Sequence, residues 1–274
     1  PNIKAKGQGG LLDIALDPDF SSNKTLFFSY SAGNMFGIGT EVATARLVNN
    51  ELKDIKVLFK ALPKSKGGRH FGSRLLLTDD NSLYITLGDR GEMDRAQDIS
   101  DHAGSMIRIN KDGSIPENNP FVKNSNAKPE IYTYGNRNIQ GIALHPTTNQ
   151  VWTIEHGPQG GDELNLMRPG INYGWPVITY GVNYGTGTKI GEGTHKNRMS
   201  QPVYYWVPSI ATSSLLFYNG EKFPEWKGDV FVSSLKFGQL ARLEMLDNKV
   251  IQEERLINGA AGRIREVKEG PDGL

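Results

Sequence analysis

Residues 67–87 read Gly-Gly-Arg-His-Phe-Gly-Ser-Arg-Leu-Leu-Leu-Thr-Asp-Asp-Asn-Ser-Leu-Tyr-Ile-Thr-Leu, and they contain the structural unit that decides the fold. Two apolar runs, Leu75–Leu77 and Leu83–Leu87, flank the polar stretch 78–82. Asp, Asn and Ser favour turns because their side chains hydrogen-bond to the nearby backbone. The stretch therefore predicts a β-hairpin, and the glycines before it place His70 in a turn at the mouth of the first strand.

The same unit returns along the chain. The copies start about 50 to 75 residues apart, which is possible for a four-stranded repeat with loop insertions. A unit that repeats and returns favours an all-β propeller over a sandwich. The other copies are Leu11–Leu16 with Thr25–Tyr30, Gly141–Leu144 with Val151–Ile154, Ser214–Tyr218 with Asp229–Ser233, and a last one that begins at Arg263–Val267. Candidate outer strands between them are Val42–Val48, Val57–Phe59, Met106–Asn110 and Leu240–Leu246.

The two ends of the chain bear on the number of repeats. A propeller closes its ring so that no strand edge stays exposed. The chain begins within a few residues of its first hairpin and stops in the middle of its last, at Leu274. We therefore expect a single propeller domain over residues 1–274 that lacks, at its two ends together, about one blade's worth of strands.

Composition excludes several classes of function. The chain has 274 residues, a formal net charge of +1 and no cysteine. Balanced charge gives no electrostatic basis for binding nucleic acid or an anionic membrane. The absence of cysteine excludes disulfides, thiolate metal sites and cysteine nucleophiles. No apolar run approaches the roughly 18 residues that span a bilayer. No signal peptide is present, although one could have been removed before Pro1.

Two side chains at the ends of one predicted hairpin suggest acid–base chemistry. His70 precedes the hairpin of residues 75–87 and Asp89 follows it, so the two side chains can be neighbours. A carboxylate beside an imidazole fixes its tautomer and raises its basicity, as a general base requires. The alternative is a surface or structural histidine, which is common beside glycines.

Further polar residues recur at the ends of strands that flank the hairpins. Gathered in one central pocket, four cations would repel each other unless a polyanion bound among them. Spread over the surface, they would be ordinary solvated charges. These cations are Arg137, Lys236, Arg263 and Arg265.

The stretch 155–163, Glu-His-Gly-Pro-Gln-Gly-Gly-Asp-Glu, is a candidate metal loop. Gly157 and Pro158 offer two backbone carbonyls in a constrained turn beside Asp162 and Glu163. Oxygen ligands of this kind suit Ca²⁺. The alternative is a tight turn with solvated acids, which we favour for Glu163.

Taken together, the motifs of the chain support a family resemblance that runs from about Gly7 to Gly273. The chain resembles the soluble glucose and aldose sugar dehydrogenases that depend on pyrroloquinoline quinone (PQQ), the glucose/sorbosone dehydrogenase family. The motifs that carry the resemblance are Gly-Gln-Gly-Gly-Leu-Leu (7–12), His-Phe-Gly-Ser-Arg-Leu (70–75), Asp-Gly-Ser-Ile-Pro-Glu-Asn-Asn-Pro-Phe (112–121), Gly-Asn-Arg-Asn-Ile-Gln-Gly (135–141), the 155–163 stretch and Asn-Tyr-Gly-Trp-Pro (172–176).

This resemblance implies a six-bladed β-propeller with the quinone at its top centre. It implies that His70 is the general base, that Asp89 orients it and that Arg137 lies by the reactive carbonyl of the quinone. It implies further cofactor contacts at Asn138, Lys236, Arg263, Arg265 and, across a one-residue gap in the match, Ser209. Gly157 and Pro158 match carbonyl ligands of Ca²⁺, whereas Gln8, Trp206 and Asp162 match residues that line or adjoin the sugar site.

The resemblance also implies an activity. We expect oxidation of an aldose at its anomeric carbon to the lactone, with PQQ and Ca²⁺ as cofactors, an external electron acceptor and a periplasmic or secreted location. Arg69 stands where glucose-specific members carry an acid, and the loops between hairpins are short, which leaves a narrow glucose specificity open. Two alternatives remain: a non-catalytic propeller that binds sugars or proteins, and a Ca²⁺-dependent lactonase. The four cations disfavour the binding propeller, because a neutral sugar does not need them. The candidate metal loop offers mainly carbonyls and few carboxylates, which disfavours the lactonase.

Overall fold

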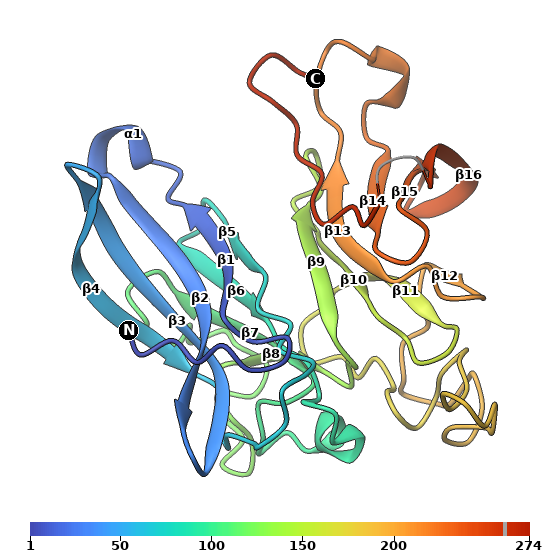
Figure 1. The fold of residues 1–274 in the computed structure, drawn as a ribbon, viewed down its shortest axis with the longest axis horizontal. Helices are drawn as coiled ribbons and strands as arrows, with labels where there is room; N and C mark the ends of the chain where they lie inside the picture. Colours follow the sequence, from blue (N-terminus) through green and yellow to red (C-terminus); the bar gives the residue numbers. More distant parts are fainter. Residues whose placement is uncertain (260–261) are drawn as a thin grey trace. The chain divides into compact units, whose positions relative to one another are not determined.

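The computed structural model describes residues 1–259 and 262–274, and these residues form an all-β structure (Figure 1). They contain four antiparallel sheets of four strands each. Helix is limited to three short pieces in the same residues: the α-helical turn α1 (Phe20–Asn23) and the 3₁₀ turns η1 (Met93–Gln97) and η2 (Pro224–Trp226). The prediction of an all-β chain is confirmed.

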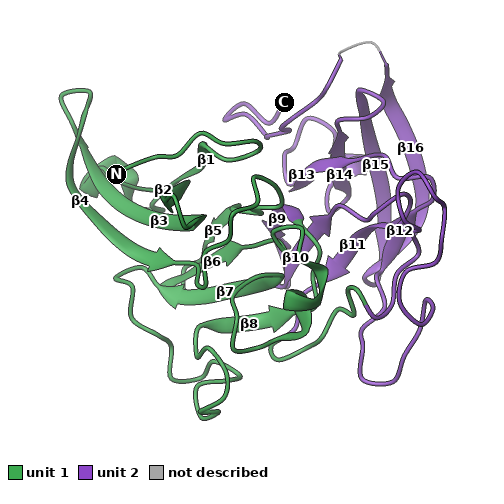
Figure 2. Cartoon of the chain, turned by 60° about the horizontal axis from the view of Figure 1, so that its bottom comes forward, with its two compact units in different colours: residues 1–138, 169–176 green, residues 139–168, 177–274 purple. Residues whose placement is uncertain are grey.

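The chain divides into two compact units (Figure 2). Unit 1 comprises residues 1–138 and 169–176, and unit 2 comprises residues 139–168 and 177–274. The single domain over residues 1–274 that the sequence predicts stays a prediction.

Unit 1 holds two sheets whose strands follow each other in chain order. Ser29 Oγ donates to the carbonyl of Ser73 at 2.6 Å, and the N–H of Leu75 donates to Asp13 Oδ2 at 2.9 Å, which ties the two sheets together. The first sheet contains β1 (Leu11–Leu16), β2 (Thr25–Asn34), β3 (Gly37–Val48) and β4 (Glu51–Lys60), and the second contains β5 (Leu75–Leu77), β6 (Ser82–Thr86), β7 (Ser105–Asn110) and β8 (Ile131–Tyr134).

Unit 2 also holds two sheets. In one the order is β12-β11-β10-β9, and in the other it is β13-β14-β15-β16, so each is again an up-and-down meander. Their strands are β9 (Ile139–Leu144), β10 (Val151–Glu155), β11 (Asp162–Leu166), β12 (Tyr204–Trp206), β13 (Thr212–Phe217), β14 (Val230–Ser234), β15 (Gln239–Leu246) and β16 (Lys249–Asn258).

The four complete hairpins predicted from sequence are confirmed, because β1–β2, β5–β6, β9–β10 and β13–β14 all pair antiparallel. Turn chemistry acts as expected in the β5–β6 hairpin. Asp80 Oδ1 accepts hydrogen bonds from Thr78 Oγ1 and from the N–H of Ser82, and Asn81 has a φ of 69°. Short polar side chains thus replace water as partners of the turn backbone.

The last predicted strand, Arg263–Val267, is wrong, because no regular element forms there. The segment attaches to β13 and β14 through separate bonds instead. The N–H of Ile264 donates to the carbonyl of Ser234, Ser213 Oγ donates to the carbonyl of Ile264, and the N–H of Val267 donates to Ser214 Oγ. Serine hydroxyls substitute for the regular ladder that a strand would need.

Each unit buries apolar side chains from both of its sheets. In unit 1 the core joins Phe27 and Val42 of the first sheet to Ile85 and Ile107 of the second. In unit 2 it includes Trp152, Ile154, Leu164, Leu215 and Val232. The core of each unit lies between its two sheets, which leaves the strand ends and loops to carry polar residues.

Among the residues that the structure describes, no helix is both long enough and apolar enough to cross a membrane.

Candidate active site

The histidine turn of unit 1, residues 67–72, has an unusual backbone. His70 adopts the left-handed conformation, with a φ of 54°, which costs a non-glycine residue free energy. Gly72 has a φ of 60°, and a Cβ there would lie 2.6 Å from backbone atoms of Leu87, so only glycine fits. The loop therefore turns sharply just before β5 and sets His70 at the mouth of that strand.

Gln8 holds this turn in place. Its backbone N–H donates to the carbonyl of Gly68 at 2.7 Å, and its side-chain Oε1 accepts the N–H of His70 at 2.8 Å. The structure thus brings Gln8 to His70. Its predicted contact with a sugar stays a prediction.

The structure also brings His70 and Asp89 together. His70 Nδ1 lies 2.6 Å from Asp89 Oδ1, and the Asp89 residue is only 1% exposed. Because a carboxylate can only accept, the imidazole carries its proton on Nδ1, and Nε2 is left as the basic nitrogen.

Trp175 is a member of this site to which the sequence assigned no role. Its indole Nε1 donates to Asp89 Oδ2 at 2.8 Å, while the N–H of Gly91 donates to Asp89 Oδ1 at 2.7 Å. Both carboxylate oxygens are therefore held by donors besides His70. Trp175 lies in the conspicuous 172–176 motif, but no local pattern links it to a residue 86 positions earlier.

Charges and burial set the protonation of the pair. Burial lowers the pKa of His70 and outweighs the hydrogen bond to Asp89, and Arg137 and Arg69 lower it further. Burial alone would raise the pKa of Asp89, yet the bonds from His70 and Gly91 and the charge of Arg137 hold it below its usual range. At neutral pH the site therefore contains a neutral imidazole beside an ionised carboxylate.

Arg137 and Asn138 lie in the connection between β8 and β9, directly before β9 begins at Ile139. The guanidinium of Arg137 lies 5.4 Å from the centre of the Trp175 ring, and its carbonyl accepts the N–H of Asp89 at 2.8 Å. Asn138 Oδ1 accepts the N–H of Gly72 at 3.1 Å. The structure thus brings four predicted residues of unit 1 to the histidine turn.

In unit 2, the candidate metal loop is held by Asp162. One carboxylate oxygen accepts the N–H of Gly157 at 2.9 Å and the other accepts the N–H of Ala211 at 2.6 Å. The Pro158 carbonyl accepts hydrogen bonds from Ser209 Oγ at 3.2 Å and from the hydroxyl of Tyr184 at 3.0 Å. Tyr184, which the sequence analysis missed, is 65% exposed.

Backbone carbonyls are the type of oxygen atom that Ca²⁺ takes as a ligand. In this structure the Pro158 carbonyl is engaged by the hydroxyls of Ser209 and Tyr184. Among residues 1–259 and 262–274, no three His, Cys, Asp or Glu side chains gather as a metal site. Ligation by Gly157 and Pro158 stays a prediction.

The expectation that Glu163 is a solvated acid in a tight turn is wrong. Glu163 lies in β11, where Asn165 Nδ2 donates both to it and to the buried Glu155 at 3.2 Å. Burial, together with the nearby charge of Glu155, raises the pKa of Glu163 well above its usual range. Strand β11 begins one residue before the expected loop ends, so Glu163 is a strand residue, and it is half-buried.

Trp206 is placed in β12 with only 4% exposure, and its Nε1 donates to Glu253 Oε2 at 3.1 Å. The next residue, Val207, is 61% exposed. The contact of Trp206 with a sugar stays a prediction.

The three predicted cations of unit 2 come from neighbouring loops. Lys236 follows β14, and the bond from the N–H of Ile264 to Ser234 brings the segment of Arg263 and Arg265 beside that strand end. All three side chains are exposed. Ile264 between the arginines is tied down, so the two arginines flank a fixed point of the backbone.

Comparison with known proteins identifies the family. The model of the Glucose / Sorbosone dehydrogenase family matches residues 1–274. The chain belongs to this family. The resemblance read from the sequence motifs is therefore confirmed.

Individual relatives agree with the family assignment. The aldose sugar dehydrogenase YliI of Escherichia coli (strain K12) is 41% identical over 278 residues, which cover 100% of this chain and 75% of that protein. A crystal structure of a glucose dehydrogenase has a TM-score of 0.96 and 40% identity, covering 100% of this chain and 80% of the other. The PQQ-bound aldose sugar dehydrogenase of Streptomyces coelicolor has a TM-score of 0.79 and 26% identity, covering 97% of this chain and 72% of the other.

Membership of the glucose/sorbosone dehydrogenase family supports an oxidoreductase with a sugar substrate. Removal of hydrogen from an alcohol releases a proton, and the neutral imidazole of His70 beside Asp89 is a group that can accept one.

Proposed function

We propose that this protein is a PQQ- and Ca²⁺-dependent dehydrogenase that oxidises aldose sugars at the anomeric carbon to lactones. The observation that carries the proposal is the buried 2.6 Å contact between His70 Nδ1 and Asp89 Oδ1. It leaves a neutral Nε2 as a base, and a base is what the anomeric hydroxyl must meet to lose its proton.

In this proposal His70 accepts the proton of the anomeric hydroxyl at Nε2. Asp89 keeps the other nitrogen protonated and stabilises the imidazolium that forms. Trp175 and Gly91 keep the carboxylate from turning away, because they donate to its two oxygens. The lowered pKa of His70 keeps the base neutral before each turnover.

PQQ, when bound, supplies the two-electron acceptor, and Ca²⁺ supplies a positive charge for oxygen atoms that become negative. We assign Arg137 and Asn138 of unit 1 to the reactive part of the quinone. Lys236, Arg263 and Arg265 of unit 2 carry fixed positive charge, which suits the carboxylates of the cofactor. Ser209 is assigned to the cofactor as well, since its hydroxyl already lies against Pro158.

For Ca²⁺ we propose the carbonyls of Gly157 and Pro158 as protein ligands. Asp162 supports this assignment, because it accepts the N–H of Gly157 and so fixes the loop that presents both carbonyls. Gln8, Trp206 and Asp162 remain our candidates around the sugar. For Asp162 the buried position favours an indirect part, through the loop that it holds.

The four sheets are proposed to be blades of a six-bladed propeller, which their antiparallel meander order supports. An external electron acceptor completes the cycle, and we place the protein in the periplasm or outside the cell on the family resemblance alone.

Replacement of the base tests the proposal. After addition of PQQ and CaCl₂, His70→Asn is expected to oxidise glucose about 10²–10⁴-fold more slowly than the parent protein, the usual range for general-base catalysis. Turnover is followed by bleaching of a dye acceptor. The matched control is His195→Asn, which changes an exposed histidine of unit 2 and should leave the rate as it is.

Two outcomes would contradict the proposal. If His70→Asn turned over at the parent rate, His70 would not be the base. If the parent hydrolysed lactones without quinone, or bound sugar without reducing added PQQ, the dehydrogenase assignment would fall in favour of a lactonase or a binding protein.

A further inference from the structure

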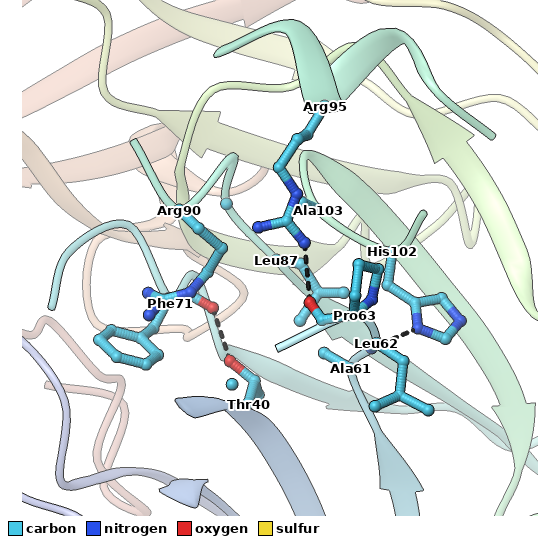
Figure 3. A pocket seen from close by; sticks show the side chains of 12 residues that line it. Thr40, Ala61, Leu62, Pro63, Phe71, Leu87, Arg90, Arg95, His102 and Ala103 are labelled. Atoms are coloured by element: carbon cyan, nitrogen blue, oxygen red, sulfur yellow. Dashed lines mark hydrogen bonds between the residues drawn. The ribbon is translucent and has the colours of Figure 1, made fainter. Parts of the chain in front are cut away.

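Arg90 follows Asp89 in the chain and is buried, with only 7% exposure. Its guanidinium donates to two backbone carbonyls of the histidine turn, those of Gly67 and Arg69. The guanidinium carbon also lies 3.5 Å from the centre of the Phe71 ring, and Figure 3 shows the Arg90 side chain beside Phe71. One arginine therefore contacts three residues of the turn that carries His70.

This arginine is an unusual buried cation. No carboxylate forms an ion pair with it in the described part of the chain, and its Nε has no hydrogen-bond partner there. Burial, with a smaller effect from Arg95, lowers the pKa of Arg90 to about 10. A buried charge without a counter-ion lowers stability, so its place here suggests a gain other than stability.

The loop of Asp89 and the loop of His70 are braced from both sides. Arg90 reaches from the first loop to the carbonyls of the second, and Arg69 reaches back, with Nη2 3.5 Å from the carbonyl of Gly91. Gly91 has a φ of 78°, and a Cβ there would lie 2.2 Å from Arg69 Nε, so the arginine side chain covers this turn. Gly91 is also the residue whose N–H holds Asp89.

We propose that Arg90 is a positioning residue for the reaction: its guanidinium fastens the His70 turn to the Asp89 turn and thereby sets the contact between Nδ1 and the carboxylate. This inference rests on the proposed role of His70 as the base. It explains why the carbonyls on either side of Gly68 both point at one side chain, and why His70 can stay in a left-handed conformation.

The chemistry of arginine suits this task. A guanidinium is planar and offers several N–H donors in a rigid fork, so it can bond two carbonyls and stack on a ring at once. A lysine at position 90 would keep the charge but offer only a point donor on a flexible stem. A methionine would keep much of the volume and lose both the charge and the bonds.

The test compares Arg90→Met and Arg90→Lys with the parent protein. The first readout is the imidazole NMR spectrum of His70, assigned by its loss in His70→Asn, which needs neither cofactor nor turnover. We expect the Nδ1 proton signal of His70 to shift or disappear in both variants. The second readout is turnover with PQQ, CaCl₂ and glucose, where kcat of Arg90→Met should fall by about 10²-fold with little change in KM, the size expected for misplacement of a catalytic group.

A matched control is Arg95→Lys. Arg95 is a half-buried arginine of unit 1 that bonds Asp101 and the carbonyl of Pro63, and Figure 3 shows its bond to Pro63. It should leave the His70 signal and the rate as in the parent. Should Arg90→Met fail to fold, Arg90→Lys carries the same test.

An unchanged His70 signal and an unchanged kcat in a folded Arg90 variant would overturn the inference. A failure of the proposed function is a separate result, because it would appear as parent-rate turnover in His70→Asn. The His70 NMR signal of the Arg90 variants would still show whether Arg90 positions the histidine turn.

Discussion

At the scale of single residues, the properties of the candidate base come from neighbours that are distant in sequence. His70 is held at its backbone by Gln8, at its ring by Asp89, and Asp89 in turn by Trp175. Of these contacts, the sequence indicated only the one between His70 and Asp89. The chemical state of the imidazole is a property of the whole set.

Burial is the largest cause of the lowered pKa of His70, and the charge of Arg69 should add a smaller shift to the acid limit of activity. Arg69 lowers the pKa of His70, because a nearby positive charge disfavours the protonated imidazole. In Arg69→Gln the pKa of His70 therefore rises, more of the base is protonated at a given acid pH, and the acid limb of the kcat/KM profile moves to higher pH.

The measurement is kcat/KM for glucose across the acid range, at low and at high salt. The shift should shrink at high salt, since exposed charges are screened within about 10 Å at 0.1 M. Arg46→Gln, an exposed arginine on β3 that pairs with Asp54, serves as the control with no shift. An acid limb at the parent position in Arg69→Gln would contradict the electrostatic account.

At the scale of elements, the local sequence pattern predicts the hairpins correctly but not how the last segment of the chain pairs with them. Four hairpins form where alternating apolar runs and turn residues predict them. The segment Arg263–Val267, in which only Ile264 and Val267 are apolar, forms no strand, and side-chain hydroxyls of Ser213 and Ser214 bond its backbone instead. Local pattern decides whether a strand can form, and the available partner decides whether it does.

Close approach of β9 and β13 in unit 2 depends on Gly141. A Cβ at this position would lie 2.7 Å from Ile154 Cγ1 and 2.9 Å from the backbone nitrogen of Leu215. We expect Gly141→Ala to destabilise the protein by about 1–3 kcal/mol, the usual cost of overpacking. That loss corresponds to a fall in Tm of a few degrees, about 2–4 °C per kcal/mol for a protein somewhat smaller than this one.

Thermal unfolding followed by circular dichroism measures the effect. Gly193→Ala is the matched control, because a Cβ at Gly193 meets nothing within 4 Å. Equal Tm values for the two variants would show that the two strands can separate without cost.

At the scale of the whole molecule, the chain builds two units by the same plan, each with two four-stranded sheets around a shared apolar core. The polar residues assigned to chemistry lie at strand ends and in loops of both units. A rigid sheet framework with functional loops is a common division of labour.

Calcium should stabilise the folded protein if the carbonyl loop binds it. A ligand that binds only the folded state stabilises it by about 2.7 kcal/mol at a hundredfold excess over Kd. Addition of CaCl₂ to chelator-treated protein is therefore expected to raise Tm, and excess EGTA should reverse the rise. MgCl₂ is the control, because Mg²⁺ demands a tighter octahedral shell than a carbonyl loop provides.

The same titration can exclude the site. If Tm is the same with CaCl₂, with MgCl₂ and with EGTA, Gly157 and Pro158 do not hold a calcium ion, and Asp162 holds the loop for a structural reason alone.

The sequence by itself determined the all-β class, the four complete hairpins and the family, because these depend on local periodicity, turn chemistry and short motifs. It also indicated the pairing of His70 with Asp89, since one hairpin separates them. Local sequence patterns do not indicate contacts between residues that lie in different hairpins.

Only the tertiary structure decided the rest. It brought Trp175, Gln8 and Arg90 to the histidine turn. It placed Glu163 in strand β11, where a solvated turn was expected, and it left Arg263–Val267 without regular secondary structure. The physical reason is the same in each case. Burial, hydrogen-bond partners and neighbouring charge are set by segments that meet only when the chain has folded, so no stretch of sequence contains them on its own.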